Sequence, residues 1–257
     1  MKSSLTIAKS LLGLVLIGTL PQANATLYDR GSGMIYDSDQ DLTWLQDANY
    51  AVTSGYAAAN LKNDGGASTD DILGDGRMGW DAAMTWATGL SFGGFSDWRL
   101  ASVTDVGDNG CTTSNGGYGG AAGTDCAYNT DTSLSELAYM FHENLGNNSW
   151  YDTSGTETGC TAPNYCLENT SAAGVDILNL QSDVYWSGTE YAPPTNYAWN
   201  FYTNNGYQYI GTKHSEFYAW AVRSGDVGAV PEPSILLLLG AGLAGLGFTK
   251  RAAKRRL

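Results

Sequence analysis

Five tyrosines near the end of the chain have the composition of a ligand-binding surface. Tyr191, Tyr197, Tyr202, Tyr207 and Tyr209 alternate with asparagines, so this segment offers aromatic faces for stacking and amides for hydrogen bonds. This combination suits a saccharide. The alternative is that half of the rings pack in the core or pair across a hairpin. We therefore expect a tyrosine-lined ligand surface, because the alternation leaves one face of the hairpin without an assigned role in the core.

Three carboxylates at alternate positions offer a second kind of site. Asp37, Asp39 and Asp41 could converge on a hard cation if their loop curls, which makes Ca²⁺ the one cofactor that the sequence suggests. Leu42 replaces the turn glycine of an EF-hand loop, and no Glu follows at the twelfth position. A solvated turn between strands is the alternative, and acidic residues 64–75 are an equally suitable site. The E-P-N and Q-P-D motifs of calcium-dependent lectins are absent.

Catalytic side chains are scarce in this sequence. The two histidines, His142 and His214, stand on an expected helix and in an expected polar turn, so a Ser-His-Asp arrangement would need a distant serine. Ser96 comes nearest to a nucleophile elbow, but Trp98 stands where the G-x-S-x-G motif requires glycine. We predict no catalytic residues and expect that the protein is not an enzyme.

Features at the N-terminus predict that the chain is exported. Lys2 and Lys9 precede an apolar stretch over residues 11–20, and Ala23-Asn24-Ala25 supplies an A-x-A cleavage site. This order is typical of a secretory signal peptide, here residues 1–25, with a mature chain that begins near Thr26. A short buried helix is the alternative.

The four cysteines are expected to form disulfides, because an exported chain folds in an oxidising compartment. Of the three possible connectivities we favour two local pairs, Cys111 with Cys126 and Cys160 with Cys166, each closing a loop of low apolar content. A zinc site is the alternative, but neither spacing is that of an ordinary zinc finger.

The elements that carry these residues follow from the apolar pattern. Residues 27–50 contain short apolar runs separated by Gly and Asp, which predict strands joined by tight turns. Residues 80–90 place apolar side chains at i, i+3, i+4 and i+7, which predicts a helix with one face on the core. Glycine turns and a strand around Trp98 follow.

A second helix is predicted over residues 133–146. Ser133 and Glu136 have the spacing of a capping box, and Gly146 stands where a C-cap glycine would. The buried stripe of this helix is expected to comprise Leu134, Leu137, Phe141 and Leu145.

Aromatic runs predict that the rest of the body is β-rich. Strands are expected in residues 184–191, 197–210 and 216–224, and residues 204–206 are expected to form a hairpin turn. The order of strands, two helices and further strands indicates an α+β domain, because βαβ repetition is missing.

Seven aromatic blocks carry a resemblance to a known family. The most specific are DWRL, YWSG and AWAVR, and the full set is DLTWLQDANY, GWDAAMTWATGL, FSDWRLAS, SELAYMF, DVYWSGTEY, NYAWNFYTNNGY and FYAWAVRS. Residues 27–225 resemble the Lcl-C-type domain of unknown function, found at the C-terminus of bacterial collagen-like adhesins. The resemblance implies a C-type-lectin-like or sulfatase-modifying-factor-like single domain over residues 26–229, with two helices and a twisted antiparallel sheet. Ala101 replaces the proline of the family's WRLP motif.

The C-terminal residues 230–257 resemble a PEP-CTERM sorting signal. Pro231, Glu232 and Pro233 precede an apolar run and a basic end, the three parts of that signal. The resemblance implies that an exosortase is a partner, and that a transmembrane segment holds the protein briefly in the inner membrane of a Gram-negative bacterium. Residues 234–249 are a little short of the roughly 20 residues that span a bilayer, and the basic end would stay in the cytoplasm.

The body between these two signals is strongly acidic. Of 13 Lys and Arg, two lie in the signal peptide and five in the tail, so six remain against 25 of the 26 acidic residues, a net charge near −19. Such a surface repels phosphate, and we expect no nucleic-acid partner. All eight Trp lie in the body, and so much aromatic content predicts a folded domain.

These observations favour an exported surface or extracellular-matrix protein, as in a biofilm, with an adhesive domain that contacts an exopolysaccharide or another glycan. An extracellular hydrolase of matrix polymers and a purely structural matrix component are the alternatives. The first alternative requires a catalytic histidine, and the second requires self-assembly without a ligand.

Overall fold

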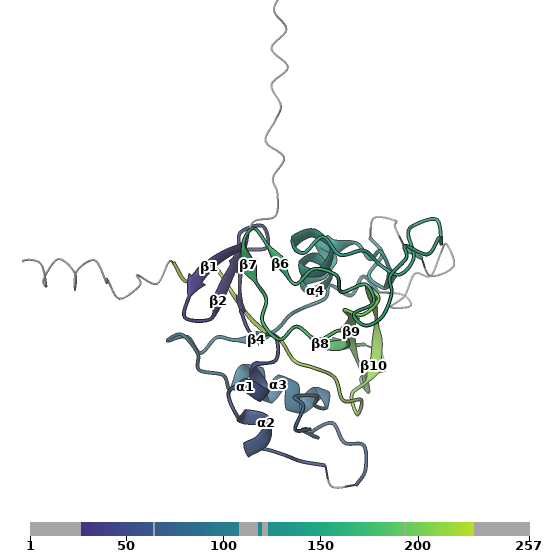
Figure 1. Cartoon of the computed structure of the whole chain (residues 1–257). Helices are drawn as coiled ribbons and strands as arrows, with labels where there is room; N and C mark the ends of the chain where they lie inside the picture. Colours follow the sequence, from purple (N-terminus) through teal and green to yellow (C-terminus); the bar gives the residue numbers. More distant parts are fainter. Residues whose placement is uncertain (1–26, 64, 108–117, 120–122, 193, 229–257) are drawn as a thin grey trace, which may run out of the picture.

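The computed structural model describes residues 27–228 apart from 64, 108–117, 120–122 and 193. The predicted signal peptide, the Pro231-Glu232-Pro233 motif and Cys111 lie outside these residues. Short helices and antiparallel strands make up the described chain, as the predicted α+β class requires (Figure 1). The helices are α1 (Tyr50–Thr53), α2 (Tyr56–Ala59), α3 (Trp80–Thr88), η1 (Thr132–Leu134), α4 (Glu136–Tyr139) and η2 (Met140–Asn144). The strands are β1 (Leu27–Gly31), β2 (Met34–Asp37), β3 (Leu42–Leu45), β4 (Arg99–Leu100), β5 (Ala127–Tyr128), β6 (Ser171–Ala172), β7 (Val175–Asp176), β8 (Val184–Tyr191), β9 (Tyr197–Tyr202), β10 (Tyr207–Thr212) and β11 (Ala221–Ser224).

The first sheet joins the two ends of the described chain. Its strand order is β1-β2-β3-β11-β4, so the last strand lies between the third and fourth. The Arg30 guanidinium pairs with Asp226 across 196 residues of sequence, and the Thr43 hydroxyl donates to the Gly225 carbonyl. The short strands predicted within residues 27–50 are confirmed as β1, β2 and β3.

The second sheet has the order β5-β10-β9-β8 and contains the predicted hairpin. Strands β9 and β10 pair antiparallel from Tyr202 opposite Tyr207 to Tyr197 opposite Thr212. The turn between them ends at Gly206, whose φ of 71° is in the left-handed region that glycine adopts most easily. Strands β6 and β7 form a separate two-stranded ribbon.

Tryptophan side chains fill the core around these sheets. Seven of the eight are buried, and Trp44 and Trp220 pack with their ring centroids 4.5 Å apart. Buried indoles need acceptors for their N–H groups, and backbone carbonyls supply them for several of these tryptophans, whereas the Trp44 indole N–H is buried without a partner in the described chain. Trp186 donates to Met78 at 2.9 Å and Trp220 donates to Leu45 at 2.7 Å. The core is therefore tied to the backbone by hydrogen bonds as well as by packing.

The first predicted helix is confirmed as α3, which buries Trp80, Ala83, Trp86 and Ala87. Two short helices, α1 and α2, were not predicted. Each is only four residues long, which is too short for an apolar repeat to appear in the sequence.

The second predicted helix begins two residues later than expected. Asp131 caps the 3₁₀ turn η1, and Ser135, not Ser133, accepts a hydrogen bond from the Ala138 N–H as the cap of α4. The capping box is therefore wrong, because Glu136 instead forms an ion pair with Arg99. The helix continues as a π turn, η2, and Gly146 follows it with a φ of 66°, as a C-cap glycine does.

The last predicted strand is shorter than expected. Only Ala221–Ser224 pairs as β11, while Phe217 and Tyr218 form isolated bridges with Met78 and Tyr185. Residues 216–220 cross from one sheet to the other, and both faces are covered there. This explains why both faces of the segment are apolar.

Within the described residues no helix is long and apolar enough to cross a bilayer. The predicted membrane segment of the sorting signal lies outside those residues.

Candidate functional site

A row of tyrosines crosses the second sheet beside the hairpin turn. Tyr207 of β10 lies directly opposite Tyr128 of β5 on one side and Tyr202 of β9 on the other. Residues opposite one another in antiparallel strands share a face, so the three rings stand together. Their centroids are 4.6 Å apart for Tyr128 and Tyr207, and 6.1 Å apart for Tyr202 and Tyr207. Tyr209, two residues further along β10, adds a ring 5.7 Å from that of Tyr207.

Two loop tyrosines extend this row beyond the sheet. The Tyr151 ring lies 5.2 Å from that of Tyr128, and Tyr118 lies 5.1 Å from Tyr151. Asn129 fixes both loops, because its side-chain amide donates to the carbonyls of Tyr118 and Tyr151 at 2.9 and 2.8 Å. We call the six residues the tyrosine ladder: Tyr118, Tyr151, Tyr128, Tyr207, Tyr202 and Tyr209.

The hydroxyls of the ladder are available to a ligand. Among the described residues, none of the six hydroxyl groups donates a hydrogen bond to, or accepts one from, another side chain or the backbone. Other tyrosines differ, since the Tyr36 hydroxyl donates to Asp41 and the Tyr185 hydroxyl accepts from the Gln181 N–H. Tyr209 is the most exposed member, at 41%. The ladder therefore presents ring surface and unpaired phenols on the same face.

Burial favours the neutral phenol at three positions of the ladder. Loss of solvent raises the pKa of Tyr128, Tyr202 and Tyr207 above the usual value of 10.0. A neutral phenol can both donate and accept a hydrogen bond, as a sugar hydroxyl also can. The ladder is therefore suited to hydroxyl groups at neutral pH.

A narrow cleft adjoins the ladder at the hairpin turn. Trp150, Tyr165, Asn204 and Asn205 line a cavity of about 240 Å³, and the two rings lie 6.1 Å apart. The backbone N–H of Trp150 donates to the Asn205 carbonyl at 2.8 Å, and the backbone N–H of Cys166 donates to the Asn204 carbonyl at 3.0 Å. The hairpin turn thus holds both walls in place.

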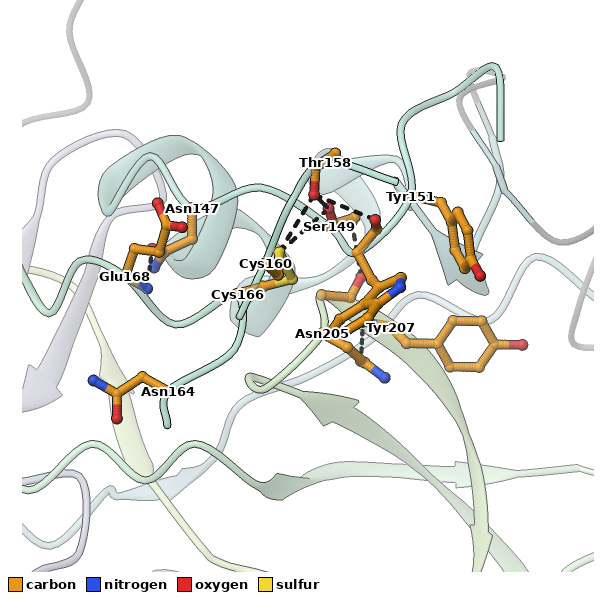
Figure 2. The surroundings of a disulfide bond; sticks show 12 residues. Asn147, Ser149, Tyr151, Thr158, Cys160, Asn164, Cys166, Glu168, Asn205 and Tyr207 are labelled. Carbon is orange, nitrogen blue, oxygen red and sulfur yellow. Dashed lines mark hydrogen bonds between the residues drawn. A yellow bond between two sulfur atoms is a disulfide. The ribbon is translucent and has the colours of Figure 1, made fainter. Parts of the chain in front are cut away.

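A disulfide closes the loop that carries Tyr165. Cys160 and Cys166 are bonded as predicted, and the Thr158 hydroxyl lies 3.3 Å from the Cys160 sulfur. Figure 2 shows this bond beside Ser149 and Asn205, with the rings of Tyr151 and Tyr207 extending away from it. Cys126 is also disulfide-bonded, while its predicted partner lies outside the described residues.

The structure brings together only three of the five predicted surface tyrosines. Tyr202, Tyr207 and Tyr209 belong to the ladder, but Tyr191 and Tyr197 pair with each other at the far end of the β8–β9 ribbon. Tyr197 is an odd number of residues from Tyr202 and therefore faces the opposite side of the sheet. Tyr191 packs there against Trp199, at 5.9 Å.

Two of the three aspartates suggested for calcium accept hydrogen bonds from other side chains. Asp37 is buried and accepts from the Asp39 N–H at 3.0 Å and from the Asn144 amide at 2.6 Å, and burial raises its pKa. Asp41 accepts from the Tyr36 hydroxyl at 2.9 Å. The described part of the chain contains no group of three or more His, Cys, Asp or Glu that could hold a metal ion. The structure therefore does not assemble this predicted site.

The two histidines lie in different surroundings. The His142 Nδ1–H donates to the Asn147 carbonyl at 2.9 Å, and its Nε2 is buried without a partner in the described chain. Burial lowers the pKa of His142 below 6.5. His214 is exposed in the turn after β10. Neither ring hydrogen-bonds to a serine or a carboxylate among the described residues.

Every basic residue of the acidic body forms an ion pair. The six pairs are Arg30–Asp226, Lys62–Asp70, Arg77–Asp75, Arg99–Glu136, Lys213–Glu190 and Arg223–Asp97. The ladder and the cleft contain no charged side chain. Sulfated or phosphorylated ligands would therefore find no unpaired cation in the described body.

The fold and the site together define an α+β domain with an uncharged aromatic face. The family model of the Lcl C-terminal domain matches residues 33–223, and the chain belongs to this family. A PEP-CTERM protein-sorting motif follows at residues 229–252, which marks an exported surface protein that an exosortase processes at the membrane. Both predicted resemblances are confirmed. No curated protein and no solved structure matches the chain.

The sequence did not reveal several residues of the site. Tyr118, Tyr128, Trp150, Tyr151 and Tyr165 come from loops or from a two-residue strand, where no apolar period exists. The one available signal was their clustering in and beside the cysteine-bounded segments.

Proposed function

We propose that this protein is a non-enzymatic surface or matrix protein of a Gram-negative bacterium, and that its tyrosine ladder binds a neutral polysaccharide. The observation that carries the proposal is the set of six phenol hydroxyls on one aromatic face that have no hydrogen-bond partner within the described part of the chain. Aromatic rings stack on the apolar faces of sugars, and the phenols and the asparagine amides of the cleft bind sugar hydroxyls. The expected similarity to C-type-lectin-like folds stays a prediction.

Charge supports a neutral polymer over an acidic one. The body carries a large excess of carboxylates, and all six of its cations are already paired. A sulfated or uronic-acid polymer would meet repulsion without compensation. A neutral glycan has no such penalty.

Binding of the exported protein to immobilised polysaccharides tests this proposal. Tyr209→Ala and Tyr207→Ala should each weaken binding to neutral polymers by about tenfold, or about 1.4 kcal/mol. Tyr197→Ala is the matched control, because this tyrosine lies in the same hairpin but on the other face. Circular dichroism verifies that the variants are folded. Equal binding by the wild type and both ladder variants, or preference for acidic polymers, would refute the proposal. Self-assembly without any glycan binding would instead support a structural matrix component.

We also infer that the sorting signal retains the protein in the inner membrane only briefly, before cleavage near Pro231-Glu232-Pro233. The position of the motif directly before an apolar run supports this inference. The intact mass of the protein from its native host is the test. A mass that still includes residues 250–257 would make the tail a permanent anchor.

A further inference from the structure

A second cavity lies away from the tyrosine ladder. It measures about 540 Å³, between the short helices α1 and α2 and the C-terminal end of α3. Figure 1 shows these three helices grouped at one end of the domain, apart from β9 and β10. The walls of the cavity comprise Tyr50, Ser54, Gly55, Tyr56, Ala59, Asn60, Thr85, Trp86, Gly89, Leu90 and Ser91.

The local sequence keeps this cavity open. Gly55 separates α1 from α2 with a φ of 79°, and a Cβ built there would meet no atom within 4 Å. Tyr50 is held by an edge-to-face contact with Phe92, with centroids 5.0 Å apart. Trp86 is 3% exposed and forms a fixed part of the wall. The cavity therefore has rigid aromatic sides and an unfilled opening at the helix break.

The walls combine aromatic faces with small polar groups. Among the described residues, the hydroxyls of Tyr50 and Tyr56 have no hydrogen-bond partner. The Asn60 amide N–H donates to the Tyr56 carbonyl at 2.9 Å, which leaves the Asn60 side-chain oxygen available as an acceptor. Ser91 and Thr85 add further hydroxyls. Donors and acceptors thus surround an apolar floor.

No charged side chain lines this cavity, although the body is rich in carboxylates. An anionic ligand would lack a cation, and a cationic ligand would lack a carboxylate. The volume lies within the range of roughly 300–1,000 Å³ that is typical of small-ligand sites. The walls therefore favour a small neutral ligand that has both apolar faces and hydroxyls.

We propose that this cavity is a second binding site, which takes one or two rings of an uncharged sugar independently of the tyrosine ladder. The rings of Tyr50 and Tyr56 offer stacking surfaces, and their hydroxyls and Asn60 bind the hydroxyls of the sugar. This proposal goes beyond binding at the ladder and does not depend on it.

Titration calorimetry with the exported protein tests the proposal directly. The probes are cellobiose, maltose and N,N′-diacetylchitobiose, with digalacturonic acid as a charged comparator. Ala59→Trp fills the cavity from an exposed position on α2, while Ala58→Trp places the same side chain on the same helix at a residue that does not line it. We expect Ala59→Trp to weaken binding of at least one neutral disaccharide by tenfold or more, and Ala58→Trp to leave it unchanged.

A milder variant covers the case in which Ala59→Trp does not fold. Tyr56→Phe keeps the ring but removes one unpaired hydroxyl, and we expect about threefold to tenfold weaker binding. Unchanged affinity in both variants, no binding of the three neutral disaccharides, or tighter binding of digalacturonic acid would each overturn the proposal.

The two sites can be tested separately. Tyr207→Ala should leave disaccharide binding at the cavity unchanged, and Ala59→Trp should leave binding at the ladder unchanged. If Tyr207→Ala abolishes all sugar binding and Ala59→Trp abolishes none of it, the cavity proposal fails and the ladder proposal stands. If Ala59→Trp abolishes all sugar binding and Tyr207→Ala abolishes none of it, only the ladder proposal is refuted. Agglutination of polysaccharide-coated beads should require both sites, because one protein molecule must hold two polysaccharide chains at once. This expectation also rests on the proposed function of the ladder.

Discussion

Removal of the Cys160–Cys166 disulfide should destabilise the domain by an amount set by its loop. The sequence separation is six, so the bond closes a loop of seven residues. For a loop of this length, the chain-entropy relation gives a loss of about 2.4 kcal/mol at 25 °C when the bond is absent. Both cysteines are buried, at 9% and 1% exposure, so serine at these positions also places a hydroxyl out of contact with solvent.

Urea unfolding of the Cys160→Ser/Cys166→Ser double variant measures this quantity. A loss of about 2.4 kcal/mol lowers the midpoint by roughly 1 M for a domain of this size. Thr158→Val is the matched control, because it removes the neighbouring hydroxyl and keeps the bond. A loss below about 0.5 kcal/mol would show that the hydrogen bond from Cys166 to Asn204 already orders the loop, and it would refute the entropic reasoning. A loss well above about 4 kcal/mol would refute it in the other direction, since the hairpin turn would then also depend on the bond.

Three further perturbations test the structure. The pKa of His142 is lower in the folded protein than in the unfolded chain, so the unfolded chain binds the proton more readily. The free energy of unfolding should therefore be fully present above pH 6.5 and decrease below it. His142→Gln should flatten this pH dependence in urea unfolding measured from pH 7 to 5. Glu136→Gln should cost about 2 kcal/mol in thermal unfolding, because the amide nitrogen cannot accept one of the two hydrogen bonds, 2.7 and 2.8 Å long, that Arg99 donates to the carboxylate. An unchanged melting temperature would contradict this. Gly206→Ala should cost about 2 kcal/mol or more, since φ is 71° and the new Cβ would lie 2.7 Å from the Ser149 hydroxyl; wild-type stability in chemical denaturation would show that the turn can relax.

Local patterns in the sequence were enough to predict the parts of the fold that depend on neighbours along the chain. Helix α3 has a complete apolar repeat, and the β9–β10 hairpin has a glycine turn between aromatic runs. The second helix shows the limit of such patterns. Ser133 and Ser135 are both acceptable caps, and the choice depends on Arg99, which binds Glu136 from 37 residues away. No local motif contains that contact.

The same distinction explains the site. Tyr202, Tyr207 and Tyr209 flank one turn, and their meeting could be predicted from hairpin geometry. Counting residues from Tyr202 would have placed Tyr197 on the other face, because side chains alternate along a strand. Tyr128 joins the ladder only because the two-residue strand β5 pairs with β10, a contact between residues about 80 apart in sequence. Sequence patterns do not encode pairings of this length.

Ion pairing relates the fold of this protein to the ligand that we propose. Arg30, Arg99 and Arg223 each bind a carboxylate far away in the sequence, so they serve to join segments and are not free for an anionic ligand. The remaining carboxylates exceed the cations, and they repel polyanions from the whole surface. The tyrosine ladder and the helical cavity are both free of charge within this acidic surface. Selectivity for a neutral glycan then arises from two sources, attraction at the aromatic sites and repulsion of acidic competitors everywhere else.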